Sequence, residues 1–399
     1  MTEKGEYDTI DVSVFLRRKR MNYQNCYSTV CYAFNKPNTL QREKAFQQLF
    51  ENSYSFVKEE ENIIANHLLA SPLQMNIKNN IVPILGIGYV ASLPEYRGNG
   101  GIKALFNELT QFCKKEAYPI SFLAPFSQPF YRQFGYENIM NQTIYHFDSQ
   151  ALNFLNKTKE GSYNRELINE KNSLKIKEIY NKVTTHLNGA LIRSNWWMTY
   201  QQIKHHPRYV VFYTYNKQES YMIYHIDGET FYIDELIYIN KEHLTGLLNF
   251  AKSHQMTVKN YQAIDPLEKL PLVFTDNQYI KQTTSPYMMA CIHDFSACQY
   301  IFNQFLTVDD QPCNIKITNS QNNNQYFTVT HNKLIEKTSI AEEELHYEGS
   351  VQAWTQFLLS PLSLKDIQYT PSPIICHHPH PMAEKRDLLR ENIHLYDYF

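Results

Sequence analysis

The sequence predicts a protein of the mixed α/β (α+β) class with more than one domain. Its 399 residues, 43% of them hydrophobic and 20% charged, are enough for two or three ordinary domains. Apolar β-rich runs alternate with helical patterns over residues 21–150, and a similar alternation returns after residue 221. From about Ser285 the pattern changes to a smaller set of strands and helices, which predicts a third, α+β unit.

Charge and cysteine content argue against several kinds of partner. The formal net charge is -2 with no basic stripe, so no nucleic-acid partner is expected. Residues 1–11 are charged, and no later window approaches the roughly 18 to 20 apolar residues that span a bilayer. We therefore expect no membrane partner and a cytoplasmic location. Reduced thiols are expected because the seven cysteines are scattered and form no C-x-x-C pair: Cys26, Cys31, Cys113, Cys291, Cys298, Cys313 and Cys376.

The first domain is predicted over residues 1–150. Its expected elements are helices at 27–34 and 41–51, strands at 53–59, 63–69 and 84–93, a helix at 100–113 and a strand at 121–124. In the helix at 100–113, apolar residues recur three or four positions apart, which predicts one buried face.

The second domain is predicted over residues 151–287. Its polar start, 156–172, is expected to be a linker or surface segment. The turn Asp227-Gly228 joins two β-rich runs, 221–226 and 230–238, into a hairpin, and a helix follows at 241–254. This order suggests a second copy of the first domain's plan. Only Gly246 stands where an anion-binding turn would need several glycines, so no cofactor is expected here.

The third domain is predicted over residues 288–399. A helix is expected near 295–305, strands at 314–318 and 326–330 around a hairpin tip at 321–325, and a helix at 351–359. A proline-broken stretch, 371–381, precedes the aromatic end of the chain.

The most informative segment is a glycine-rich turn between a strand and a helix, from Tyr89 to Lys103 (YVASLPEYRGNGGIK). Glycines at a helix start let backbone N–H groups approach an anion, and the helix N-terminus adds favourable partial charge. We interpret this turn as a pyrophosphate site with Arg97 and Lys103 beside it. Its spacing matches neither the P-loop nor the dinucleotide fingerprint. An ordinary helix start remains the alternative.

A second motif, Tyr-x-x-Phe-Gly-Tyr, covers Tyr131 to Tyr136 after the next predicted strand. In a chain with 30 tyrosines, a packed aromatic is the plain alternative for Tyr131. The chain ends on Phe399, for which a frayed terminus is the ordinary expectation.

These motifs resemble a known family. Arg97 to Ile102 resembles the R-G-x-G-x-[GA] signature by which GNAT N-acetyltransferases hold coenzyme A, with Ile102 in the last position. With Tyr131 to Tyr136 and Arg193 to Trp197, nearly the whole chain resembles the Eis (enhanced intracellular survival) acetyltransferases. The resemblance implies two tandem GNAT-like domains, the second degenerate, followed by a sterol-carrier-protein-like α+β domain whose C-terminus docks into the active site. It also implies a homohexamer.

The same resemblance implies the site residues. Tyr131 would be the general acid, and the terminal carboxylate of Phe399 the general base. Acetyl-CoA would be the cosubstrate, with no metal. Its binding residues would be Val90, Ala91, Ser92, Arg97, Gly98, Asn99, Gly100, Gly101, Ile102, Lys103, Phe126 and Ser127.

The reaction implied is acetyl transfer to a primary amine of a small polycationic acceptor: an aminoglycoside, a polyamine or a lysine-like group. Asp397 is one acidic residue that could attract ammonium groups. A phenol of pKa ~10 can supply a proton to a thiolate whose conjugate acid has pKa ~8.5. Two alternatives remain: a non-catalytic acyl-CoA-binding or lipid-binding protein, and a tandem-GNAT aminoacyl or fatty-acyl transferase.

Three further signals have plain interpretations. Cys376-His377-His378-Pro379-His380 contains zinc-type ligands, but neighbours in a proline-broken loop rarely converge on one ion, so a surface loop is expected. His205-His206 is expected to face solvent or line a groove. Trp196-Trp197 is expected in the core, although in the resembling family the central domain walls the substrate cleft.

Overall fold

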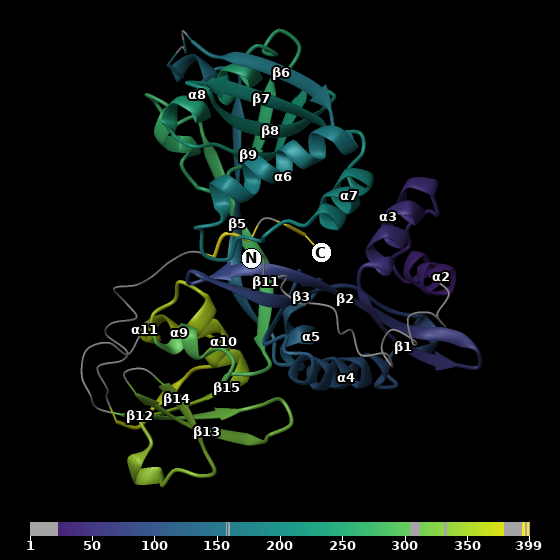
Figure 1. Cartoon of the computed structure of the whole chain (residues 1–399), viewed down its shortest axis with the longest axis vertical. Helices are drawn as coiled ribbons and strands as arrows, with labels where there is room; N and C mark the ends of the chain where they lie inside the picture. Colours follow the sequence, from purple (N-terminus) through teal and green to yellow (C-terminus); the bar gives the residue numbers. More distant parts are fainter. Residues whose placement is uncertain are drawn as a thin grey trace, which may run out of the picture.

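The computed structural model describes residues 23–156, 158, 160–303, 312–330, 333–378, 393–395 and 397–398. Within these residues the strands form one 11-stranded sheet and one five-stranded sheet. Figure 1 shows three lobes: the N-terminal lobe in purple and blue, the second in teal and green above it, and the third in yellow-green at the lower left. The mixed α/β class predicted from the sequence is confirmed.

The N-terminal lobe contains most of the predicted elements. They are α2 (Tyr23–Ala33), α3 (Leu40–Glu51), β1 (Tyr54–Glu60), β2 (Ile63–Ile77), β3 (Asn80–Ser92), η1 (Pro94–Tyr96), α4 (Gly101–Lys115), β4 (Ile120–Leu123), α5 (Gln128–Arg132) and β5 (Glu137–Asp148). Successive residues of β2 point to opposite faces: Asn66 lies against Gly101 of α4, and the His67 ring lies 6.0 Å from that of Phe46 in α3. The two helix layers therefore cover opposite faces of the sheet.

The elements of the second lobe begin at Ala151. Its elements are η2 (Ala151–Phe154), β6 (Ser162–Leu167), α6 (Glu170–Thr184), α7 (Asn195–Lys204), β7 (Tyr209–Tyr215), β8 (Gln218–Asp227), β9 (Thr230–Ile237), α8 (Lys241–Lys252), β10 (Asn260–Ile264) and η3 (Leu270–Val273). The hairpin around Asp227-Gly228 is confirmed. For the linker or surface segment expected at 156–172, the linker alternative is wrong in part, because β6 pairs with β7 and α6 starts at Glu170, while the exposure of β6 agrees with a surface segment. β6 is an exposed edge strand and lacks the alternation that marks a half-buried strand.

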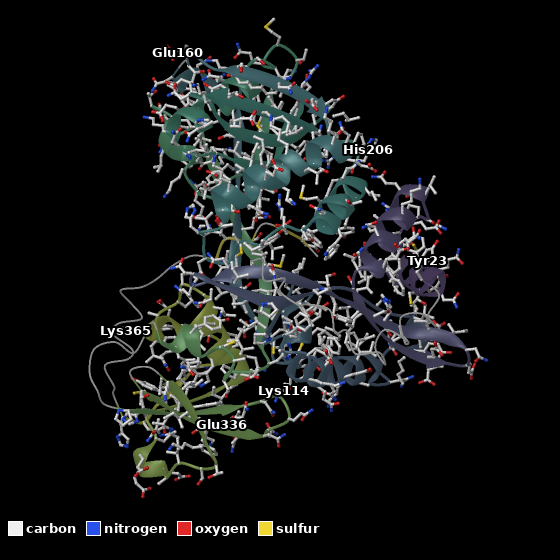
Figure 2. The ribbon with its side chains drawn as sticks, in the orientation of Figure 1. Tyr23, Lys114, Glu160, His206, Glu336 and Lys365 are labelled. Atoms are coloured by element: carbon white, nitrogen blue, oxygen red, sulfur yellow. The ribbon has the colours of Figure 1, made fainter. Side chains whose placement is uncertain are left out.

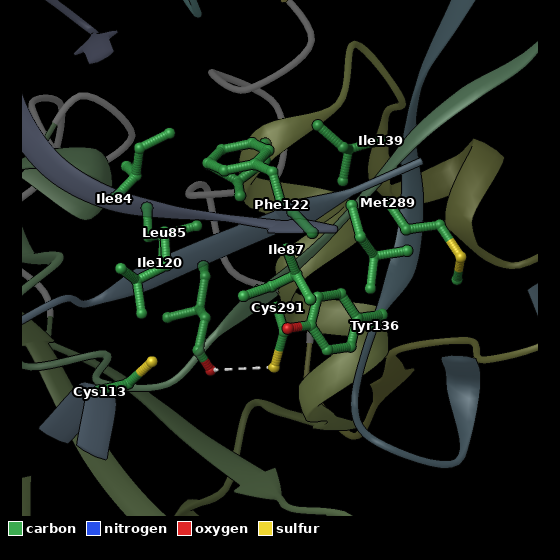
Figure 3. Packing of buried hydrophobic residues seen from close by; sticks show 14 of the residues in the cluster. Ile84, Leu85, Ile87, Cys113, Ile120, Phe122, Tyr136, Ile139, Met289 and Cys291 are labelled. Atoms are coloured by element: carbon green, nitrogen blue, oxygen red, sulfur yellow. Dashed lines mark hydrogen bonds between the residues drawn. The ribbon is translucent and has the colours of Figure 1, made fainter. Parts of the chain in front are cut away.

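Strand β11 (Lys281–Ile292) joins the first two lobes. It pairs with β5 from Lys281 to Ala290, and its last four residues also pair with β4. The boundary predicted between residues 287 and 288 falls inside this strand. Figure 3 shows side chains of β11 packed with those of β3 and β4 in one core: Ile84, Leu85, Ile87, Ile120, Phe122, Met289 and Cys291. The end of β11 therefore completes the sheet of the N-terminal lobe.

The third lobe is a small α+β unit. It contains α9 (Gln299–Asn303), β12 (Cys313–Thr318), β13 (Asn324–Thr330), β14 (Lys333–Lys337), η4 (Glu342–Glu344), β15 (Tyr347–Ser350), α10 (Val351–Leu359), α11 (Leu364–Ile367) and β16 (Ile375–Cys376). Helix α10 docks on the N-terminal lobe: the amide of Gln352 donates to the Arg132 carbonyl at 2.8 Å, and that of Gln356 to the Asn138 carbonyl at 2.8 Å. The sterol-carrier-protein likeness stays a prediction. Within the described ranges, no helix is long and apolar enough to cross a membrane.

Helix α7 of the second lobe is fastened to α3 of the first. The Gln41 side chain donates to the carbonyls of Ile203, at 3.0 Å, and His206, at 2.7 Å, where α7 ends. Figure 2 shows the side chains of the two helices meeting beside the label of His206. This contact holds one face of α7 over the N-terminal lobe.

Candidate active site

A cleft opens where two parallel strands separate. β3 pairs with β4 only from Ile84 to Ile87, opposite Ile120 to Leu123. Beyond this point β4 ends, while β3 continues to Ser92 beside β2. The backbone of β3 past Ile87 therefore has no strand on its β4 side, and this gap can admit an extended ligand.

A bulge in β3 lies at the mouth of this gap. Between the pairs His67–Ala91 and Leu69–Gly88, β3 has one extra residue, so Tyr89 and Val90 have no partner in β2. Tyr89 has a positive φ of 53°, which is uncommon for a residue other than glycine. The fully buried His67 places Nδ1 3.1 Å from the Tyr89 carbonyl oxygen and fixes the bulge from behind.

The glycine turn has the geometry that the sequence predicted. Gly98 and Gly100 have φ values of 82° and 72°, which only glycine adopts readily. Gly100 is the N-cap of α4 and makes no side-chain cap, so the first amides of the helix remain available to a ligand. A Cβ on Gly101 would lie 1.9 Å from Oδ1 of Asn66, so this glycine permits close packing of the helix on β2.

The turn and the bulge border one cavity of about 800 Å³. Ten of the twelve predicted cofactor residues line it: Val90, Ala91, Ser92, Arg97, Gly98, Gly100, Gly101, Ile102, Lys103 and Phe126. Asn99 and Ser127 are not among the lining residues. Ser127 caps α5 instead, because its hydroxyl accepts a hydrogen bond from the Phe130 N–H at 3.4 Å.

A second cavity, of about 690 Å³, continues from the first. The two share Phe34, Val90 and Phe126 in their linings, so they form one cleft with two chambers. We call the chamber at the glycine turn the turn chamber and the other the tyrosine chamber. Tyr131 and Tyr398 line the tyrosine chamber.

Tyr131 is held rigidly at the wall of the tyrosine chamber. It is only 3% exposed, and its ring lies 5.3 Å from that of Phe126 and 6.0 Å from that of Phe106. The next residue, Arg132, makes two hydrogen bonds of 2.8 Å to the fully buried carboxylate of Glu137, which fixes the turn after the tyrosine. Burial, and secondarily Tyr398, raises the pKa of Tyr131, so its phenol stays protonated at neutral pH.

The end of the chain is anchored beside this wall. Asp397 is 3% exposed and accepts hydrogen bonds from Nε of Arg193 at 3.1 Å and from Nε1 of Trp197 at 2.7 Å. Arg193 also pairs with Glu235 at 3.0 Å, and Nζ of Lys204 donates to the Tyr398 carbonyl at 3.1 Å. Phe399 lies outside the described residues.

The chain-end anchor corrects one expectation and adds to another. Asp397 forms a buried ion pair with Arg193, so its charge is not available to an ammonium group. Trp197 is fully buried, as expected, but it also bonds the chain end. The Arg-Ser-Asn-Trp-Trp motif therefore holds the terminal segment, a role that no pattern around residue 193 indicated.

The remaining predicted features lie away from the cleft or at its edge. Gly246 allows α8 to pack on Tyr213, because a Cβ there would lie 2.4 Å from the tyrosine ring. His205 and His206 line a neighbouring cavity, which shares Tyr398 with the tyrosine chamber. Nε2 of His377 lies 3.3 Å from the Glu348 carboxylate, and His380 is outside the described residues. Among the residues whose placement is given, no three His, Cys, Asp or Glu side chains are grouped to hold a metal.

Most lining residues of the tyrosine chamber were missed at the sequence level, among them Lys36, Arg42, Tyr200 and Lys204. They come from the α2–α3 connection, α3 and α7, and only the contact between α3 and α7 brings them together. Lysine and arginine near helix ends are routine, so no local signal distinguishes them.

Comparisons with known proteins agree with this architecture. Two sequence profiles, each described as an acetyltransferase (GNAT) domain, match residues 17–139 and 189–293. No curated protein matches the chain significantly.

Solved structures match over almost the whole chain. A protein of unknown function from Enterococcus faecalis, described as a probable N-acyltransferase, has 25% identity and a TM-score of 0.80 over 94% of this chain and 97% of its own. A GCN5-related N-acetyltransferase from Anabaena variabilis has 17% identity and a TM-score of 0.77 over 95% of this chain and 98% of its own. Eis1 from Mycobacterium abscessus has 14% identity and a TM-score of 0.75 over 94% of this chain and 97% of its own. The chain therefore belongs to the GNAT acetyltransferases, as a member with two such domains in tandem and the Eis-like fold.

Proposed function

We propose that the chain transfers an acetyl group from acetyl-CoA to the amine of a small acceptor. The observation that carries this proposal is one continuous cleft, opened by the separation of β3 from β4, with the glycine turn in one chamber and Tyr131 in the other. The pyrophosphate of the cofactor would bind at Gly98 to Lys103. The pantetheine arm would follow the unpaired backbone of Val90, which brings the thioester towards Tyr131.

The residues of the tyrosine chamber would then perform the chemistry. The amine attacks the thioester carbonyl, the carbon–sulfur bond breaks, and the leaving thiolate takes a hydrogen bond or proton from the Tyr131 phenol. The attacking amine must lose a proton, and we assign this role to the terminal carboxylate of Phe399. The anchoring of Asp397 and Tyr398 beside Tyr131 supports that assignment. Much of the acceleration comes from holding amine and thioester together.

The three lobes would have separate duties. Residues 1–150 bind acetyl-CoA, residues 151–287 wall the cleft with α7 and bind no cofactor, and residues 288–399 supply the chain end. By the family resemblance we also propose a homohexamer that acts in the cytoplasm without a metal.

Tyr131→Phe tests the chemical step. We expect at least a hundredfold fall in kcat for thiol release from acetyl-CoA, with a coenzyme A Kd by calorimetry within twofold of wild type. Appending residues after Phe399 should have the same effect, because the terminal carboxylate is displaced. Tyr369→Phe is the matched control, since Tyr369 is 92% exposed. Wild-type turnover in both Tyr131→Phe and the protein extended after Phe399 would refute the assigned roles.

The binding step separates the proposal from its alternatives. Failure of the folded protein to bind coenzyme A would refute the whole proposal. Cofactor binding without thiol release for any amine would identify a non-catalytic acyl-CoA-binding protein. Preference for a long-chain acyl or aminoacyl donor over acetyl-CoA would instead identify the alternative transferase.

A further inference from the structure

We propose that the acceptor is an amine that also carries an anionic group, a carboxylate or a phosphate. This inference rests on the proposed function and specifies its substrate class. It follows from the charge of the tyrosine chamber, which differs from what a polycationic acceptor needs.

Three cationic side chains from separate segments line the tyrosine chamber. Lys36 lies between α2 and α3, Arg42 lies in the first turn of α3, and Lys204 is the last residue of α7. Within the described part of the chain, no aspartate or glutamate lines this chamber. Glu43, next to Arg42 on α3, is not a lining residue. The chamber therefore presents a positive field to whatever enters it.

Among the described residues, the groups in direct contact with the Lys204 ammonium are neutral. Its Nζ donates to the Tyr398 carbonyl at 3.1 Å and lies 5.1 Å from the ring centres of both Tyr200 and Tyr398. Burial lowers the pKa of Lys204 to about 8, because the ammonium is less well solvated in this place than in water. An anionic group on the acceptor would offset this loss of solvation.

The other charges near the chamber do not reverse its sign. A neighbouring cavity that shares Tyr398 with this chamber is lined by Asp234, Glu235 and Asp397. Each of these carboxylates is already paired, Glu235 and Asp397 with Arg193 and Asp234 with Arg208. The terminal carboxylate, our proposed base, would add one negative charge against the three positive side chains. A polyamine or aminoglycoside would bring several more positive charges into the same space and be repelled.

The lining and volume of the tyrosine chamber indicate which acceptors are suitable as probes. Aromatic rings form much of the lining, among them Tyr27, Phe34 and Tyr89, and the volume of about 690 Å³ is within the range of ~300–1,000 Å³ that is usual for small-molecule sites. A small acceptor with an aromatic ring would fit these walls.

The test compares amines that differ in one anionic group. Tyrosine is compared with tyramine, and O-phosphoethanolamine with ethanolamine; spermine and kanamycin represent polycations. We expect kcat/KM for thiol release to be at least tenfold higher for the anionic member of one or both pairs, and the pair that responds distinguishes carboxylate from phosphate. Higher kcat/KM for the polycations than for either anionic amine would overturn the inference.

Variants assign the effect to the chamber. Arg42→Gln and Lys204→Met should each raise KM for the preferred anionic acceptor about tenfold, while KM for acetyl-CoA changes less than twofold. Lys44→Gln is the matched control, because Lys44 is an exposed cation on the same helix as Arg42 and does not line the chamber. An equal rise in KM for the anionic acceptor in Lys44→Gln would contradict the proposal. An unchanged KM in both Arg42→Gln and Lys204→Met would also contradict it.

Equilibrium binding gives an answer if no probe is acetylated. Calorimetry on the protein saturated with coenzyme A would compare N-acetyltyrosine with N-acetyltyramine and N-acetylspermine. We expect the anionic product to bind at least ten times more tightly, and equal or weaker binding would overturn the inference. Coenzyme A binding, measured first, separates this failure from failure of the proposed function.

Discussion

Gly101 illustrates how one missing side chain shapes the proposed cofactor site. The glycine has an ordinary helical backbone, so its necessity comes from its neighbour Asn66, which occupies the space of a Cβ and also donates to the Ser92 hydroxyl at 2.7 Å. The sequence signature located this turn correctly. It could not show which glycines are needed for a positive φ and which are needed because a neighbour leaves no space for a side chain. The neighbour of Gly101 belongs to a strand more than thirty positions earlier in the chain.

Gly101→Ala should weaken both the fold and cofactor binding. The added methyl group must displace Asn66 or lift the start of α4, and overpacking of this kind costs ~1–3 kcal/mol. We expect a lower melting temperature and a coenzyme A Kd raised at least tenfold, measured by calorimetry. Adding Asn66→Ala should recover part of both losses. A melting temperature and Kd equal to wild type in Gly101→Ala would show that the turn tolerates the side chain.

Lys204 should make acceptor binding depend on pH. Its pKa is lowered to about 8 by burial, so it is charged below pH 8 and neutral above it. Tyr131 and Tyr200 stay uncharged in this range because burial raises their pKa values, while the charge of Asp397 helps to keep Lys204 protonated. KM for an anionic acceptor should therefore rise as pH increases through 8. If KM for the anionic acceptor still rises through pH 8 in Lys204→Gln, the pH dependence belongs to another group.

At the scale of elements, the chain end and α7 behave as one unit. Residues 393–395 pack beside the second lobe: the His394 N–H donates to the Asn188 carbonyl at 2.8 Å, and Ile393 occupies the space beside Gly189. Asp397 then meets Arg193 and Trp197. Tyr398, which follows, lines the tyrosine chamber.

Asp397→Asn should release the chain end. Breaking one side of a buried ion pair costs ~3–5 kcal/mol, although Arg193 keeps its partner Glu235. We expect kcat to fall at least tenfold while the coenzyme A Kd changes less than twofold. Glu219→Gln is the control, since it breaks the more exposed Lys175–Glu219 pair. Unaltered kcat in Asp397→Asn would separate the anchor from catalysis.

Element prediction succeeded where the signal was local. The helix at 351–359 and the Asp227-Gly228 hairpin were predicted closely, because periodicity and turn chemistry are properties of a few consecutive residues. The bulge at Tyr89 was missed, since it is held by His67 from another strand. β6 was missed because an exposed edge strand has little apolar alternation to detect.

For the whole molecule, β11 makes the N-terminal lobe dependent on residues far along the chain. Its last residues lie between β4 and β5, where Met289 and Ala290 are fully buried. The tandem plan could be predicted from motif order and resemblance. The insertion of β11 could not, because strand pairing over such a distance leaves no mark in the local pattern.

A fragment of residues 1–150 should fail to fold. β4 and β5 would face each other without the strand that separates them, and their apolar side chains would be exposed. We expect no cooperative thermal transition by circular dichroism and no coenzyme A binding. Residues 1–292 should recover both. A folded 1–150 fragment that binds coenzyme A would show that the N-terminal lobe is independent of β11.

This arrangement also sets an order for events on the ribosome. The first domain to be synthesised cannot close its sheet until Ile292 has left the exit tunnel, so the growing chain carries an unfinished strand edge while the whole second domain is being made. The proposed cofactor site would thus be assembled late in translation, even though nearly all of its residues are made early.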